Sequence, residues 1–108
     1  MNTTNSFVLA GRLTADAEVS KLTNSHKAVI RVAFNSKKDD KTTTAFVSLE
    51  AFNKDPQAFD ILKKGQLMKF NGFFRADEWE DKEGKKQNRL VFVSTSWEKF
   101  EYTKKEDE

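Results

Sequence analysis

Apolar and polar residues alternate along five segments of this chain, and this alternation is what most narrowly limits how the chain can fold. Successive side chains of a strand point to opposite faces, so a period of two predicts strands that each bury one face. The predicted strands span residues 5–13, 27–36, 44–52, 67–79 and 87–100, with a short continuation of the first at 18–22. Polar hairpin tips are expected at 36–43 and 80–86. The chain is therefore predicted to be all-β.

A single helical signal separates the third and fourth predicted strands. Asp55 can cap a helix, and Pro56 fits the first helical position, where its missing N–H is harmless. The buried stripe of this helix is expected to be Ala58, Phe59 and Leu62. Lys63 and Lys64 would lie in its last turn, and Gly65 would end it. Five strands with one short helix between strands 3 and 4 predict an OB-fold, a small barrel that commonly binds oligonucleotides. A five-stranded SH3-like barrel is the competing fold, but it offers this helix no natural place.

Composition excludes several classes of protein. The chain has no cysteine, which rules out disulfides, thiolate metal sites and a cysteine nucleophile. Its 108 residues make one domain, predicted at 1–101, with a short charged flexible tail at 102–108. No segment resembles a signal peptide, and no apolar run approaches the ~20 residues of a membrane span, so a cytoplasmic protein without a membrane partner is expected.

Catalytic and metal-binding residues are not expected. The only histidine, His26, lies in a predicted polar turn, without a serine–carboxylate arrangement beside it. An acidic cluster near the second hairpin tip alternates with lysines and lacks the spacing of a cation site; it comprises Asp77, Glu78, Glu80, Asp81 and Glu83. A solvated hairpin is the simpler interpretation, so the chain is predicted to have no catalytic residue, no metal and no cofactor.

The net charge of +2 conceals a gradient along the chain. Residues 1–75 hold 12 Lys and Arg against seven Asp and Glu, whereas residues 76–108 hold seven against ten. A basic body attracts a polyanion, and the acidic end is repelled by it.

Aromatic side chains lie on the predicted solvent face of the third strand. Val47, Leu49 and Ala51 share the apolar parity, which leaves Phe46 and Phe52 on the polar side. Exposed rings along one sheet face can stack the bases of an unpaired nucleic-acid strand, whatever their sequence. The alternative is that both rings fill a second core or a subunit contact.

The fourth strand repeats this pattern. Its apolar parity holds Met68, Phe70 and Phe74, with Gly72 permitting a barrel bend, and the other parity carries rings interleaved with cations. Rings supply surface for bases, and cations neutralise phosphates. The predicted single-strand site comprises Phe46, Phe52, Phe73, Trp79, Arg12, Arg31, Lys37, Lys38, Lys54, Lys69, Arg75, Lys85 and Lys86.

Over residues 5–100 the chain also resembles the bacterial single-stranded DNA-binding protein family. The matching stretches are VLAGRLT at 8–14, DAEV at 16–19, IRVAFN at 30–35, FVSLEAFNK at 46–54, KG at 64–65 and GFFR at 72–75, then Trp79, Asp81 and Gly84. The resemblance implies an OB-fold that binds unpaired DNA without catalysis, usually as a tetramer. It also implies that Phe46, Phe52 and Trp79 are the base-stacking aromatics.

Three departures from the family's pattern are visible. A further stacking tryptophan of better-known members would fall near Lys38, so one platform is expected to be lost. The Asp-Pro-Glu of many members is Asp16-Ala17-Glu18, a change in turn rigidity. The end of the chain, 104–108, is acidic but has no long linker and no apolar last residue. Replication or repair proteins are candidate partners, but recruitment in the family's usual way is not expected, and a mobile-element, phage or accessory version fits.

The favoured prediction is a non-catalytic single-stranded DNA-binding protein of replication, recombination or repair, located with the nucleoid. The resemblance implies two copies paired around residues 3–6 and a homotetramer built as a dimer of dimers, with a dimer as the alternative. Two other functions stay open: a dimeric primosomal protein that contacts a helicase as well as DNA, and an OB module for RNA or for protein partners.

Overall fold

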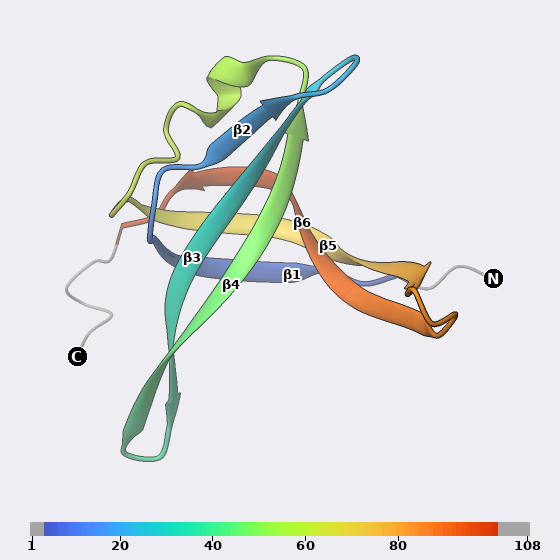
Figure 1. Cartoon of the computed structure of the whole chain (residues 1–108). Coiled ribbons are helices and arrows are strands. Elements are labelled where there is room, and N and C mark those ends of the chain that lie inside the picture. Colours follow the sequence, from blue (N-terminus) through green and yellow to red (C-terminus); the bar gives the residue numbers. More distant parts are fainter. Residues whose placement is uncertain (1–3, 102–108) are drawn as a thin grey trace.

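The computed structural model describes residues 4–101 and consists of one sheet with a single helical turn. Its elements are β1 (Phe7–Leu13), β2 (Glu18–Lys21), β3 (His26–Lys38), β4 (Lys41–Asn53), η1 (Pro56–Phe59), β5 (Leu67–Glu80) and β6 (Lys86–Lys99). The sheet order is β1-β5-β6-β4-β3-β2, and pairing of β1 with β3 closes five strands into a barrel (Figure 1). The predicted all-β OB-fold is confirmed. The tail predicted at 102–108 lies outside the described residues.

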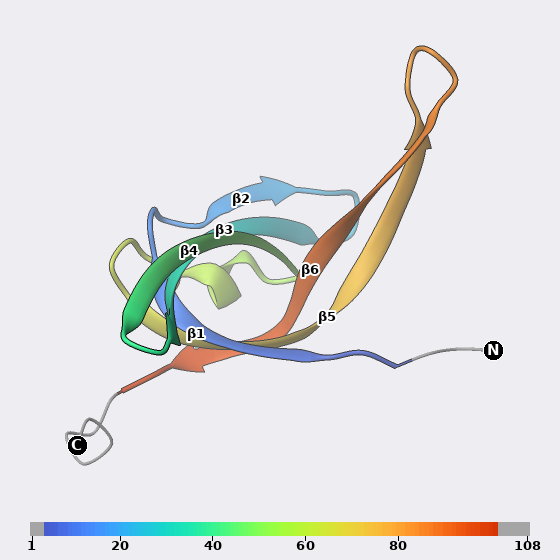
Figure 2. The ribbon, with the colours of Figure 1, turned by 90° about the horizontal axis from the view of Figure 1, so that it is seen from below.

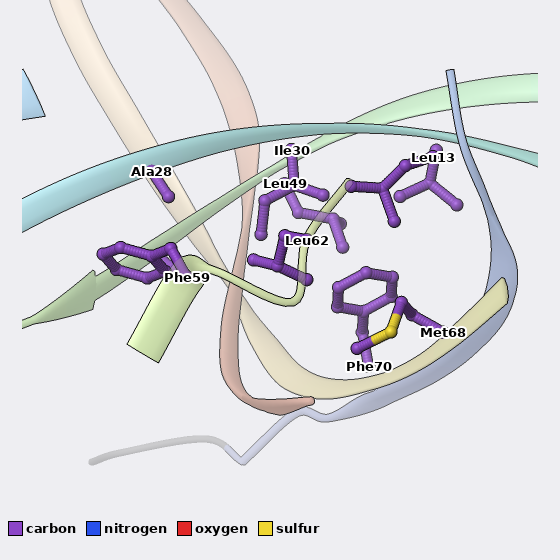
Figure 3. Packing of buried hydrophobic residues seen from close by; sticks show 10 residues of the cluster. Leu13, Ala28, Ile30, Leu49, Phe59, Leu62, Met68 and Phe70 are labelled. Atoms are coloured by element: carbon purple, nitrogen blue, oxygen red, sulfur yellow. The ribbon is translucent and has the colours of Figure 1, made fainter. Parts of the chain in front are cut away.

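The barrel is filled by the apolar parity of its strands. The residues of this core are at most 3% exposed: Leu13, Ala28, Ile30, Val32, Leu49, Ala51, Phe59, Leu62, Met68 and Phe70. Phe59 and Leu62 come from the connection between β4 and β5 and point into the cluster formed by the strands (Figure 3). Each large side chain buried in this way contributes about 1.5–3 kcal/mol relative to an exposed one.

The predicted helix is shorter than expected. Asp55 caps it as predicted, its carboxylate accepting from the Gln57 amide at 2.9 Å, but only a 3₁₀ turn over Pro56–Phe59 forms. The prediction that Lys63 and Lys64 lie in its last turn is wrong. Bonds to the β1–β2 connection hold the following segment instead: Ala17 N–H donates to the Leu62 carbonyl at 3.0 Å, and Lys64 N–H to Asp16 Oδ1 at 2.8 Å. These tertiary bonds replace the helical ladder.

A glycine bends the barrel where β5 meets β6. The pairing changes register between Asn71 and Gly72, so that Thr95 is left as the extra residue of a β-bulge. A Cβ placed on Gly72 would lie 1.9 Å from the Val93 carbonyl oxygen, which no side chain can tolerate. The irregularity falls at Gly72, where a bend is predicted, and close approach of the Val93 backbone is why only glycine fits there.

Two hairpins extend beyond the barrel as arms (Figures 1 and 2). We name them the β3–β4 arm and the β5–β6 arm. The first is longer than predicted, because pairing continues through the expected loop as far as Lys38 and Lys41. Three threonines, 42–44, favour extended backbone, and Asp39 takes a positive φ of 55° that suits a two-residue turn.

The first strand starts later than predicted, at Phe7 rather than Asn5. The Asn5 side chain takes the place of a strand residue: its Oδ1 accepts from Phe74 N–H at 2.6 Å, and its Nδ2 donates to the Phe74 carbonyl at 3.3 Å. The edge of β5 is therefore satisfied at this point by an amide side chain.

Candidate functional site

Four aromatic rings lie exposed on the outer face of the barrel. Phe46 and Phe52 on β4 are 72% and 40% exposed, and Phe73 and Trp79 on β5 are 40% and 47% exposed. None belongs to the core, so the alternative that Phe46 and Phe52 fill a second core is wrong for this chain. β5 stays regular through Trp79, which brings that ring to the same parity as Phe73.

Strand register brings the two pairs of rings onto one continuous surface. β6 runs between β4 and β5, and its Val93 lies opposite Glu50 on one side and Phe73 on the other. On β3, Lys27 stands opposite Phe52, and Arg31 stands opposite Ser48. We call this surface, made by the outward side chains of β3, β4, β6 and β5, the outer face.

The outer face has an apolar floor. Val91 and Val93 of β6 are only 6% exposed, yet they are not part of the core cluster. Val91 lies opposite Arg75, and Val93 lies opposite Phe73. Longer side chains from the two neighbouring strands therefore cover these valines from the outside.

Charges of alternating sign cross the floor. We call them the ion row, which comprises Lys27, Glu50, Arg75, Asp77 and Arg89. Lys27 Nζ lies 3.5 Å from Glu50 Oε2, and Arg75 Nη2 lies 3.4 Å from Glu50 Oε1. Arg75 Nε donates to Asp77 Oδ1 at 2.9 Å, and Arg89 Nη2 lies 3.9 Å from Asp77 Oδ2. The hydrogen bond between Arg75 and Asp77 raises the pKa of Arg75 and lowers the pKa of Asp77 from their ordinary values. Both groups stay charged at neutral pH.

Two other predicted arginines are also engaged by the protein. Arg31 Nη1 donates to Glu18 Oε1 at 2.8 Å, and Arg12 Nη1 donates to the Gly65 carbonyl at 3.0 Å. Arg12 lies at the margin, since it pairs with Ala33 of β3, and Ala33 in turn pairs with Phe46.

The predicted lysines are more scattered. Exposed on the arms or just after β4 are Lys37, Lys38, Lys54, Lys85 and Lys86. Lys69 is half-buried on β5, opposite Ala10 of β1 and Glu98 of β6. The structure therefore gathers the four rings, Arg31 and Arg75 on the outer face, places Arg12 at its margin, and leaves Lys69 near the start of β5, before the bulge.

The predicted acidic hairpin tip is organised by one carboxylate. Asp81 Oδ1 accepts from the amides of Glu83 and Lys85, each at 2.9 Å, and its Oδ2 accepts from Gln87 Nε2 at 3.1 Å. These bonds, with that of Lys85 foremost, lower the pKa of Asp81. Trp79 stands opposite Gln87 in the ladder, so the same carboxylate bonds the strand residue that pairs with the ring.

His26 is not in a turn as predicted; it begins β3, is half-buried, and its Nδ1–H donates to the Lys54 carbonyl at 3.2 Å. Within residues 4–101, no group of three or more His, Asp or Glu side chains is placed to hold a metal ion. The same part of the chain has no helix long and apolar enough to cross a membrane.

Shallow hollows flank two of the rings. One of about 550 Å³ lies beside Trp79 and is lined by Ala76, Asp77, Glu78, Trp79 and Arg89. Another of about 310 Å³ lies beside Phe46 and is lined by Thr14, Arg31, Val32, Phe46, Val47 and Ser48. The outer face offers open troughs beside flat rings rather than an enclosed pocket.

Sequence reasoning missed most of the ion row. Lys27 shares the parity of Arg31, so strand alternation could have found it. Alternation alone gives Glu50 no role on the face, and it predicts Asp77 in a solvated hairpin. Arg89 meets Asp77 only through the β5–β6 register, for which the sequence carries no direct signal.

Known proteins resemble this chain in sequence and in fold. The single-strand binding protein family matches residues 4–100. A single-stranded DNA-binding protein of Borreliella burgdorferi is 32% identical over 98 residues, which cover 82% of this chain and 65% of that protein. The chain thus spans 65% of the length of this curated relative. A solved structure described as Plasmodium falciparum SSB in complex with ssDNA shares the fold, with a TM-score of 0.73 at 15% identity, covering 94% of this chain and 98% of the other.

Proposed function

This chain belongs to the single-strand binding protein family, and we propose that it binds single-stranded DNA without catalysis, in replication, recombination or repair. The observation that carries the proposal is the set of four exposed rings on one sheet face, with cations beside them. The relatives named above are described as binding single-stranded DNA, which supports the same ligand here. A location with the nucleoid follows from such a function.

The proposed mechanism divides the work between rings and cations. Bases stack on Phe46, Phe52, Phe73 and Trp79, and every base offers a flat face, so the binding is largely independent of sequence. The exposed lysines, among them Lys37, Lys38 and Lys54, neutralise phosphates, which makes affinity fall steeply with added salt.

The test is a titration of the protein with dT, rU and duplex oligonucleotides. Binding of dT is expected to quench Trp79, and alanine at Phe46, Phe52 or Trp79 is expected to cost about 1–3 kcal/mol each, the usual contribution of base stacking. Trp79→Phe is the matched control, since it keeps a ring but loses the fluorescence change. Folded alanine variants that bind dT normally would contradict the proposal, and a response to rU equal to that to dT would favour the RNA alternative.

We also propose that the protein assembles with copies of itself, as a dimer of dimers. Within residues 4–101, β1 pairs with β3 only at Arg12 and Leu13, which leaves one edge of Phe7–Gly11 without a strand. Val8, 66% exposed, adds apolar surface there. Such edges are usually covered, and a second copy in two-fold symmetry would cover this one. Light scattering should report a tetramer; a stable dimer favours the primosomal type, and a monomer at micromolar concentration contradicts both.

A further inference from the structure

The Arg75 side chain lies along the outer face instead of rising from it. Arg75 belongs to β5, yet its Nη2 reaches Glu50 Oε1 of β4 at 3.4 Å. β6 runs between those two strands, and neighbouring strands are about 4.8 Å apart. To reach Glu50, the side chain must cross over β6, where Val91 stands opposite Arg75.

Two carboxylates fix the guanidinium in this position. Asp77 accepts from Nε at 2.9 Å and from Nη2 at 3.3 Å, which is a fork on one edge of the guanidinium plane. Glu50 accepts from the same Nη2 on the far side of β6. The donors on this edge are therefore committed to the protein, although the Arg75 side chain remains 41% exposed.

The floor beneath the guanidinium is apolar. Val91 and Val93 are buried although they lie outside the core, because side chains of the outer face cover them. A guanidinium is weakly hydrated on its flat faces and packs well on apolar or aromatic surface. Arg75 crosses this floor, and because its side chain is 41% exposed, part of it faces solvent.

We propose that Arg75 is a stacking platform for an unpaired base and not a phosphate anchor. The inference rests on the proposed function and names a fifth platform for it. Bases stack on arginine planes as they do on aromatic rings. On β5 the platform falls between Phe73, two residues before it, and Trp79, four residues after it, all of the same parity.

Phosphate binding at Arg75 is disfavoured by the same contacts. A phosphate on the edge that holds Nε would have to displace Asp77 or Glu50, and one that approached the remaining Nη1 donors would be repelled by both carboxylates close by. A base needs only the exposed flat face and leaves these bonds intact.

The experiment compares Arg75→Lys with the wild type on a dT oligonucleotide and on an abasic oligonucleotide of the same length. Lysine keeps the charge but has no plane and cannot form the fork. Stacking predicts a loss of roughly tenfold in affinity for dT, no loss for the abasic strand, and an unchanged salt dependence. Arg31→Lys is the comparison variant, since Arg31 also pairs with a carboxylate on the outer face, and any affinity lost on this exchange should be lost equally for the two strands.

The phosphate alternative predicts the opposite pattern. Arg75→Lys would then bind dT normally, and Arg75→Gln would lower the slope of log K against log salt by about 0.7. That result overturns the inference. A wild-type protein that fails to bind dT at all would contradict the proposed function instead, so the two failures are distinguishable.

A measurement on the wild type covers the case in which Arg75→Lys does not fold. The Nε–H of Arg75, held by Asp77, gives a separate proton–nitrogen resonance. Stacking of a base over the plane should shift this proton upfield with dT and leave it in place with the abasic strand. A downfield shift with both strands would indicate a hydrogen bond to phosphate and overturn the inference.

Discussion

The β3–β4 arm and the β5–β6 arm are both two-stranded hairpins that leave the barrel, yet they are held in different ways. The β3–β4 arm has its backbone ladder and one side-chain bond, from Thr44 to Asn35 at 2.9 Å. The β5–β6 arm adds the Asp81 carboxylate at its tip and the Arg75–Asp77 fork at its base. Side chains fasten the β5–β6 arm, which we therefore call the fastened arm. The β3–β4 arm depends mainly on backbone pairing, and we call it the loose arm.

The difference corresponds to what each arm carries. Trp79, which we propose as a base-stacking ring and which would need one fixed orientation for that role, lies on the fastened arm. Lys37 and Lys38, for which we propose an action on phosphates at a distance that needs no fixed geometry, lie on the loose arm. Stacking requires a positioned surface, and charge neutralisation requires only proximity.

The largest expected effect comes from the base of the fastened arm. Gly72→Ala should destabilise the protein by about 2–3 kcal/mol, because the new Cβ collides with the Val93 carbonyl, which is backbone and cannot move aside. Urea unfolding measures the loss. Gly84→Ala at the tip is the control. Nothing lies within 4 Å of the added Cβ, so the cost is only that of placing alanine at a positive φ of 83°, about 1–2 kcal/mol. Equal losses at the two glycines would show that close approach does not shape the arm.

Acid should loosen the fastened arm first. Because the folded protein holds the pKa of Asp81 below its ordinary value, the carboxylate stabilises the fold fully above that value. This contribution is lost as the pH falls through the ordinary range of aspartate to the lowered pKa. The protection of the Glu83 and Lys85 amides against hydrogen exchange should then fall, whereas that of the Lys37 amide should not. Asp81→Asn should abolish this pH dependence, and an identical acid response in that variant would refute the assignment.

A ring added to the loose arm tests whether fastening matters. Lys38→Trp places a ring near the tip, opposite Lys41, and should tighten dT binding by only about 0.5–1 kcal/mol, at or below the low end of base stacking, because the arm must be ordered at the same time. Fluorescence titration against Lys38→Gln separates the ring from the lost charge. A gain as large as the loss in Trp79→Ala would mean that the two arms are equally ordered.

The smallest expected effect concerns the turn of the loose arm. Asp39 has a φ of 55°, a conformation that glycine adopts without a steric penalty. Asp39→Gly should leave the free energy of unfolding within about 0.5 kcal/mol of the wild type, since relief of strain is offset by added freedom of the unfolded chain. Thermal unfolding provides the measurement, and a large loss would reveal a side-chain role for Asp39.

Alternation of residue types predicted the strands, the exposed rings and the bend at Gly72, because each of these depends on local patterning. It did not predict the early end of the helix, since that end is imposed by bonds from Ala17 and Asp16, far away in sequence. It also missed that Arg75 reaches Glu50, because that contact depends on the parallel pairing of β4 with β6. Nonlocal register is what alternation alone cannot supply.

The position of β6 in the sheet has a consequence for how the protein is made. β6 lies between β4 and β5, with parallel pairing to β4 and antiparallel pairing to β5. It is the last strand in the described residues 4–101. During synthesis the β3–β4 hairpin can form early, since hairpins fold within microseconds and translation adds only some 5–20 residues per second. The barrel cannot close until β6 has left the ribosome. The rings of β4 and β5 therefore come to share one surface only after nearly the whole domain has been synthesised, so a nascent chain lacks the complete outer face.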